Sequence, residues 1–300
     1  MKVSVITTVW NVAEWIEKNI QAFLNQTLKD SELILVNDCS PDNSGELISK
    51  YKDSRIKVIN NKVNLGPGIS RQIGLDNSIG EYTIFVDGDD WLEEDCLEKM
   101  YNEAIEKDAD IVSCRTIQHN EYGLLPNKPV GYIYKKEDFY NFINNKLIRR
   151  TLWSETHYSP LRFREDINTL FRCLELSKNT VKMEYAGYNY NLRPNSLTST
   201  KGVAGKSFLY NTLAAIENVK WIKDKGIEPT PRYKHYYNNN AIRYLYSLSR
   251  TFLGTNINKY KEECTIIEEF LKNNPIEFIG KNLFELFKIN RNEKENRNYI

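Results

Sequence analysis

The first 117 residues alternate short apolar runs with amphipathic stretches, and this pattern restricts the fold more than any other feature of the chain. The apolar runs predict strands at residues 3–9, 33–36, 56–59, 82–86 and 110–117. One-sided apolar spacing predicts helices at 13–25, at 68–78, at 93–107 and, with Pro41 in its first turn, after Ser40-Pro41-Asp42. Continuous apolar strands joined by helices are typical of βαβ units, in which helices cover both faces of a parallel sheet. The sequence therefore predicts an α/β fold with a Rossmann-like, mostly parallel sheet flanked by helices.

The composition of the chain restricts the partners and the cellular compartment that we expect for the protein. The chain has 300 residues with 41 basic and 40 acidic side chains, so its charge gives no reason to expect a nucleic-acid partner. Its five cysteines include no Cys-x-x-Cys pair, which favours reduced thiols over a disulfide framework. No apolar run approaches the roughly 18 residues that suggest a membrane span. We therefore expect a cytoplasmic protein.

The alternation weakens after residue 118. A helix is predicted at 136–146 and another after Arg164-Glu165-Asp166, followed by a strand at 181–185. From about residue 206 to the end the pattern predicts helices, with breaks at Gly and Pro residues. We expect a sheet region at 1–118, a second region of the same domain at 119–200, and a helical C-terminal extension at 201–300.

The end of the chain has an amphipathic segment at 283–289, followed by Arg291, Lys294 and Arg297. Such a segment fits a membrane surface, which would give the protein a peripheral position at the inner face of the membrane. It fits equally well against the body of the protein or against a second subunit, so an oligomer is compatible with the sequence.

Three carboxylates follow the predicted strand at 82–86, in the turn Asp87-Gly88-Asp89-Asp90. Acidic side chains this close repel one another, and each costs free energy to remove from water unless a positive charge lies among them. Mg²⁺ or Mn²⁺, which prefer oxygen ligands, would meet that need. An acidic turn that caps the next helix is the alternative. Polar residues at two other strand ends, Thr7-Thr8 and Asn37-Asp38, favour a ligand site, because such sites lie outside the carboxyl ends of strands.

Motifs across about residues 1–200 resemble glycosyltransferase family 2 and occur in the order expected for it. The first motif is an opening turn at Thr7-Thr8-Val9-Trp10-Asn11, and the second is an acidic stretch at residues 36–44. The third is a glycine-containing helix start at residues 64–74, and the fourth is the acidic turn at residues 87–90. Asn37, Cys39 and Gln72 stand where the family has Asp, Gly and Asn. Residues 145–150 and Glu165-Asp166 are similar to its acceptor-side elements. The resemblance implies a GT-A fold and an inverting sugar transfer from a nucleotide donor.

The resemblance also implies roles for the acidic turn. It makes Asp89 the metal ligand and places Asp87 at the ribose or, through water, at the metal. Asp90 is either a hydrogen-bonding partner of this cluster or the cap of a helix beginning near Glu93, and we prefer the cap.

Other donor-side positions follow in the same way. Asp38 matches a carboxylate that contacts uracil, with an Asx turn to Ser40 as the alternative. Arg71 is expected at the nucleotide, with a solvated helix face as the alternative. Thr8 and Trp10, in the opening turn, are expected to bind substrate.

On the acceptor side, the resemblance makes Asp166 the general base, with Glu165 beside it at the substrate. A carboxylate near the acceptor hydroxyl suits a single displacement with inversion. A Glu-Asp pair at a helix start also stabilises the helix dipole, which is the structural alternative. Arg193 and Ser196 are expected at the diphosphate, or else in a surface loop held by Pro194.

We therefore expect a glycosyltransferase that moves a sugar from a UDP-sugar to a hydroxyl of a glycan or lipid-linked acceptor, in bacterial surface polysaccharide synthesis. Two other functions compete with this one. A sugar nucleotidyltransferase would open with a Gly-rich phosphate loop containing Arg and Lys, which residues 7–10 do not offer. A catalytically inactive nucleotide-binding module would not need to retain Asp87, Asp89 and Asp166.

Overall fold

The computed structural model describes residues 1–119, 132–133, 143–159, 165–194 and 196, together with short pieces between 213 and 282. The chain divides into two compact units, Met1–Ser196 and Leu197–Ile300. The first unit contains the sheet and all the predicted site residues.

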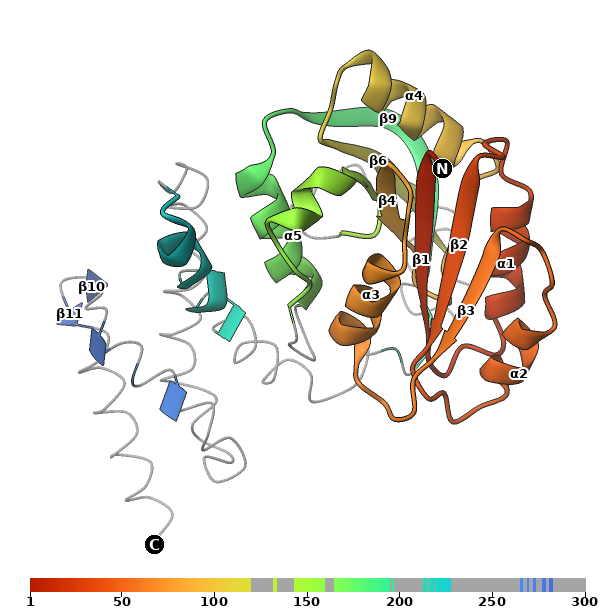
Figure 1. Ribbon diagram of the computed structural model, residues 1–300, viewed down its shortest axis with the longest axis horizontal. Helices are drawn as coiled ribbons and strands as arrows, with labels where there is room; N and C mark the ends of the chain where they lie inside the picture. Colours follow the sequence, from red (N-terminus) through yellow and green to blue (C-terminus); the bar gives the residue numbers. More distant parts are fainter. Residues whose placement is uncertain are drawn as a thin grey trace, which may run out of the picture. The chain divides into compact units, whose positions relative to one another are not determined.

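The sheet begins with parallel strands, as the alternating pattern predicts. Neighbouring strands run in the order β3 (Ile56–Asn60), β2 (Ser31–Asn37), β1 (Val3–Val9) and β4 (Tyr82–Phe85). The order then continues through β8 (Lys146–Arg149), β6 (Ile111–His119), β9 (Thr180–Asn191) and β5 (Trp91–Leu92), with β7 (Tyr132–Ile133) paired to β6. Strands β6 and β9 are parallel, whereas β8 is antiparallel to both of its neighbours. The sheet is therefore mixed but mostly parallel, and its curvature is visible in Figure 1.

Helices cover both faces of this sheet (Figure 1). One face packs against α1 (Ile16–Leu24) and α4 (Cys96–Glu106), through a core that contains Ile20 and Met100. The other face packs against α3 (Pro67–Asp76) and α5 (Glu165–Leu176), through a core that contains Leu75 and Leu170. This arrangement leaves the carboxyl ends of β1, β2 and β4 at one edge, between helices of the two layers.

Strand β8 is the main departure from the sequence prediction. A helix was expected at 136–146, but residues 143–145 form a bend and turn, and Lys146 begins the strand; residues 136–142 lie outside the described residues. Leu147 and Ile148 are both fully buried and point into opposite cores. Two consecutive apolar residues are too short a run for periodicity to distinguish a strand buried on both faces from a segment of helix.

Helix α2 (Ser44–Ser49) also begins later than predicted, so Pro41 is not in its first turn. The preceding residues form a polar turn, in which the Ser40 hydroxyl donates to Asp42 at 2.6 Å. Asp42 in turn accepts from the backbone N–H of Ala13, 2.9 Å away. Burial tends to raise the pKa of Asp42, but these hydrogen bonds outweigh it and lower the pKa.

The second unit is described only in pieces. Helical residues lie between 213 and 225, as predicted, but β10 (Glu277–Phe278) and β11 (Lys281–Asn282) form an antiparallel pair where helices were expected. The break predicted at Pro275 precedes this pair. The amphipathic segment at 283–289 lies outside the described residues. Within the described part of the chain, no helix is long and apolar enough to cross a membrane.

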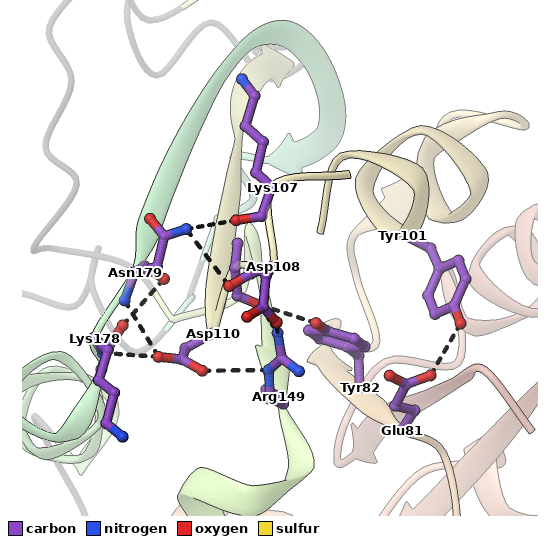
Figure 2. Close-up of polar contacts among 11 residues, drawn as sticks. Glu81, Tyr82, Tyr101, Lys107, Asp108, Asp110, Arg149, Lys178 and Asn179 are labelled. Atoms are coloured by element: carbon purple, nitrogen blue, oxygen red, sulfur yellow. Dashed lines mark hydrogen bonds and ion pairs between the residues drawn. The ribbon is translucent and has the colours of Figure 1, made fainter. Parts of the chain in front are cut away.

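A polar network fixes the edge of the sheet opposite the carboxyl ends of β1 and β4 (Figure 2). Asp110, just before β6, accepts from the backbone N–H groups of Lys178 and Asn179 at 2.7 and 3.2 Å. Arg149 forms ion pairs with Asp110 and with Asp108, and its guanidinium lies 5.3 Å from the centre of the Tyr82 ring. The turn that leads into β9 is thereby tied to β6 and β8.

We predict that Asp110→Ala lowers the free energy of unfolding by about 1–3 kcal/mol, because it leaves two backbone donors without their acceptor. Asp108 is the matched control, since its side chain is 92% exposed while that of Asp110 is 17% exposed. Asp108→Asn, which keeps a residue tolerant of the positive φ at this position, should change stability little. Urea unfolding of both variants measures these changes. Equal losses of unfolding free energy would show that the network stabilises the protein no more than a pair of surface charges does.

Candidate active site

The acidic turn lies where the ends of three parallel strands meet. Thr8 of β1 is paired with Val36 of β2, and Ile6 with Phe85 of β4, so the turn at 87–90 adjoins the ends of β1 and β2. Gly88 permits this contact, because a Cβ there would lie 3.0 Å from the Thr8 carbonyl oxygen and 2.9 Å from a methyl group of Val12. The predicted convergence of polar residues at one edge is therefore present.

Arg71 joins the acidic turn to α5. Its guanidinium donates to Asp87 at 2.7 Å and to Glu165 at 2.6 Å, and the residue is only 6% exposed. Asn144 donates to the other carboxylate oxygen of Asp87, also at 2.7 Å. A solvated helix face for Arg71 is thus wrong. The arginine instead brings together the two carboxylates that the sequence assigned to the donor side and to the acceptor side.

Asp90 does not cap α4, which corrects the interpretation we preferred. Helix α4 begins at Cys96, whereas the side chain of Asp90 accepts from the Tyr188 hydroxyl at 2.5 Å and from the Asn191 N–H at 2.8 Å. The residue is 1% exposed, and burial beside the charges of Asp89 and Asp87 raises its pKa well above the ordinary value. Asp90 therefore fixes the end of β9 against the acidic turn.

Asp89 lies beside Arg193, which follows β9. The two side chains form an ion pair, and Arg193 also lies 4.9 Å from the ring of Trp15. Burial and the charge of Asp87 raise the pKa of Asp89, while Arg193 opposes that rise. Arg193 thus belongs to the acidic cluster, and its expected contact with a diphosphate stays a prediction. Ser196 is half-buried three residues later. Trp10 is 42% exposed just after β1.

Asp38 supports the loop that leads into α3. Its carboxylate accepts from the backbone N–H groups of Leu65 and Gly66, both at 2.8 Å, and from the Asn61 amide at 2.9 Å. The expected Asx turn to Ser40 is made by Asn37 instead, at 3.0 Å. A carboxylate has about four acceptor directions, of which these donors occupy three, and the residue is 3% exposed.

Glu165 and Asp166 form the first turn of α5, where their charge suits the helix N-terminus. Glu165 is 6% exposed, and burial, together with the charge of Asp166, raises its pKa to about 7 even though Arg71 opposes this. Asp166 is half-buried, and its charge acts on Glu165, on Tyr158 and on Lys146. A carboxylate at this helix start, such as that of Asp166, can take a proton from a hydroxyl group.

Sequence reasoning missed Asn144 and Tyr188. Asn144 precedes the missed strand, and nothing in its local sequence distinguishes it from other polar residues. Tyr188 lies in a run of tyrosine and asparagine residues that predicts a strand but not its partners. Both contact Asp87, since the Tyr188 hydroxyl lies 3.4 Å from the Asp87 N–H.

A mixed, mostly parallel sheet with helices on both faces and an acidic turn at its carboxyl edge is a GT-A-like fold. The family model described as Glycosyl transferase family 2 matches residues 4–171, more than half of the chain. The protein belongs to glycosyltransferase family 2. The prediction of both fold and family is confirmed.

Relatives and solved structures agree with this assignment. The glycosyltransferase GlyA of Streptococcus pneumoniae is 30% identical over 66% of this chain, but the match spans only 31% of GlyA. TuaG of Bacillus subtilis, named for teichuronic acid biosynthesis, is 27% identical over 73% of this chain and 90% of its own. The crystal structure of Staphylococcus aureus TarS (residues 1–349) in complex with UDP-GlcNAc has a TM-score of 0.70 and 19% identity, covering 92% of this chain and 82% of TarS in that structure. At that identity the likeness shows the fold.

The raised pKa of Glu165 gives a pH prediction. Since the folded protein holds this proton up to about pH 7 and the unfolded chain releases it near pH 4.5, Glu165 makes the free energy of unfolding fall as pH rises between those values. We expect Glu165→Gln to lessen that fall, by on the order of 2 kcal/mol over the interval. Denaturant unfolding of both proteins from pH 4.5 to pH 8 measures it. Loss of the pairing with Arg71 can lower the stability of the variant by a constant amount at every pH. If the two curves of unfolding free energy against pH were parallel, the expectation would be contradicted.

Proposed function

We propose that this protein transfers a sugar from a UDP-sugar to a hydroxyl group of a glycan or lipid-linked acceptor, with inversion at the anomeric carbon and assistance from a divalent cation. The setting proposed is bacterial surface polysaccharide synthesis. The observation that carries the proposal is the Arg71 bridge, because it joins an acidic cluster suited to a nucleotide sugar with a carboxylate pair suited to an acceptor. A nucleotidyltransferase has no need of the second carboxylate pair.

The donor would lie against the carboxyl edge of the sheet. Asp38 has an acceptor direction left for a ring N–H of uracil, and Trp10 exposes apolar surface just after β1. Arg193, now paired with Asp89, would contact the diphosphate and stabilise the charge that develops as the sugar leaves. TarS binds UDP-GlcNAc on the same fold, which supports a UDP-sugar as donor.

The acidic turn suits a hard cation. The donor set is carboxylate oxygen, and burial together with the charges of the neighbouring carboxylates raises the pKa values of Asp89 and Asp90. Among the residues that the structure describes, no group of three or more His, Cys, Asp or Glu side chains is placed to hold a metal. Asp89, with the diphosphate oxygens and water, would therefore hold Mg²⁺ or Mn²⁺, and Asp87 would contact the ribose or reach the ion through water. Such an ion neutralises charge on a diphosphate leaving group.

The acceptor hydroxyl must lose a proton as it attacks the anomeric carbon. We assign Asp166 as the base, because Glu165 is committed to Arg71 while Asp166 is half-buried at the same helix start. Attack from the face opposite the diphosphate breaks the bond to the leaving group as the new glycosidic bond forms, so the configuration inverts. The name of TuaG, which refers to teichuronic acid biosynthesis, supports a polysaccharide acceptor.

Asp89→Ala should weaken UDP binding in Mn²⁺ by about tenfold or more, the effect of losing a charged ligand to the ion. Calorimetry with UDP, with and without Mn²⁺, measures this in both proteins. Metal-independent UDP affinity in the wild-type protein would remove the cation from the proposal.

UDP should also raise the melting temperature of the protein more than GDP or ADP does. Equal stabilisation by GDP would remove uracil recognition from the proposal.

Asp166→Asn keeps the size of the side chain but cannot accept a proton at neutral pH. We predict that transfer falls by roughly 10²-fold or more while donor affinity stays within about twofold, because the residue acts on the acceptor. A panel of UDP-sugars, with product configuration read by NMR, provides the assay. Near-normal transfer by the variant would move the base to Glu165, and a retained configuration would rule out a single displacement.

A further inference from the structure

Helix α1 carries an asparagine on its buried face, where the other side chains are apolar. The buried residues of α1 are Ile16, Asn19, Ile20 and Phe23, and Asn19 is 4% exposed. Asparagine favours the interior of a helix less than leucine does, and burying an amide costs free energy unless it finds partners. Leucine would suit the helix and the core better, so the presence of Asn19 calls for an explanation.

The amide of Asn19 holds both ends of the acidic turn. Its nitrogen donates to the backbone carbonyl of Asp87 at 3.1 Å and to that of Asp90 at 2.9 Å. The Asp87 carbonyl also accepts from the backbone N–H of Asp90 at 2.9 Å, which closes the turn. One side chain of α1 thus reaches the first and the last residue of the turn.

The backbone and the side chains of the turn are held from different sides. The Asp87 carboxylate accepts from Arg71 of α3, and the Asp90 carboxylate accepts from Tyr188 of β9. Asn19 reaches the backbone of the turn from α1, which packs on the opposite face of the sheet from α3 (Figure 1). The side-chain contacts fix where two carboxylates point, whereas those of Asn19 fix the path of the chain between them.

Asp89 depends on this path because it lies between the two residues whose carbonyls Asn19 holds. Its side chain pairs with Arg193, from the segment after β9. In the proposed function Arg193 contacts the diphosphate, so its pairing with Asp89 would not fix that carboxylate once a donor is bound. Neighbouring carboxylates also repel one another. A turn released from α1 would therefore let Asp89 move away from the position in which it meets the diphosphate.

We propose that Asn19 is a positioning residue, whose amide fixes the backbone of the acidic turn and so holds Asp89 in place for the cation on the diphosphate. This rests on the proposed function, in which Asp89 is the metal ligand. Groups that orient a metal ligand contribute roughly 10–100-fold to metal affinity without touching the ion. Asn19 acts in this way through two backbone carbonyls.

Asn19→Leu tests the proposal, because it keeps the approximate size of the side chain and removes both donors. Calorimetry should show that UDP affinity in Mn²⁺ falls by about tenfold or more, while UDP affinity without Mn²⁺ stays within about twofold. In protein without metal or nucleotide, the Asp90 N–H should exchange with solvent faster than in the wild type, as read by ¹⁵N NMR, because the turn opens more readily. If Asn19→Leu does not fold, Asn19→Ala, which places no bulk against the two carbonyls, replaces it in every measurement.

Gln26→Met is the matched control, since Gln26 is also buried and also uses its amide to hold backbone carbonyls. It is 0% exposed, and its amide donates to the carbonyls of Ala22 and Glu93 at 3.0 and 2.8 Å, outside the acidic turn. Gln26→Met should lower stability but leave the effect of Mn²⁺ on UDP affinity almost unchanged. An unchanged effect of Mn²⁺ in Asn19→Leu, or an equal loss in Gln26→Met, would overturn the proposal.

A double variant tests whether Asn19 acts through Asp89. In an Asp89→Ala background, Asn19→Leu should change UDP affinity in Mn²⁺ by less than about twofold, and additive losses would overturn the proposal. Failure of the proposed function would look different. If the wild-type protein bound UDP equally well with and without Mn²⁺, the cation would be removed from that function. Faster exchange of the Asp90 N–H in Asn19→Leu, but not in Gln26→Met, would still show that Asn19 holds the turn.

Discussion

The buried guanidinium of Arg71 is the interaction on which the site depends. It lies between Asp87, at the end of a central strand, and Glu165, at the start of a helix from the second half of the domain. Burial of Glu165, together with the charge of Asp166 beside it, raises the pKa of Glu165, and Arg71 opposes that rise. Removing the arginine would leave Glu165, whose side chain is 8% exposed, without this positive charge, whereas Asp87 is 32% exposed and would keep its hydrogen bond from Asn144. A single side chain thus joins the acidic turn to the start of α5.

The sheet region could be predicted because its signals are local. Strands β1 to β4 and β6 each contain several apolar residues within a short stretch, and turns or helix starts mark their ends, so the local pattern located them to within two residues. Strand β8 has only Leu147 and Ile148 as its apolar signal, between charged residues. It is a strand because β4 and β6 flank it, which is information that a short window of sequence does not contain.

The site residues were easier to name than their partners. Asp38, Asp87 and Asp89 lie at the predicted edge, because strand ends determine their position, and Glu165 lies at the predicted helix start. Asp90 was misassigned since a buried aspartate and a helix cap look alike in sequence, and its partners Tyr188 and Asn191 are about 100 residues away. The burial of Arg71 could not be read from the local sequence either, because it depends on α5. Position follows from local pattern, whereas hydrogen-bonding partners follow from the tertiary fold.

Strand β9 is held by an aspartate at each end. Asp110 accepts from the N–H of Asn179 just before it, and Asp90 accepts from the N–H of Asn191 at its last residue. Between these two points β9 has 12 residues while its neighbour β6 has 9, and the surplus is taken up in two irregular steps on either side of Arg115. The length of β9 is therefore set by the separation of two carboxylates. A chain one residue shorter could satisfy only one of them, or it would have to straighten one of the irregular steps and turn Tyr188 away from the acidic turn.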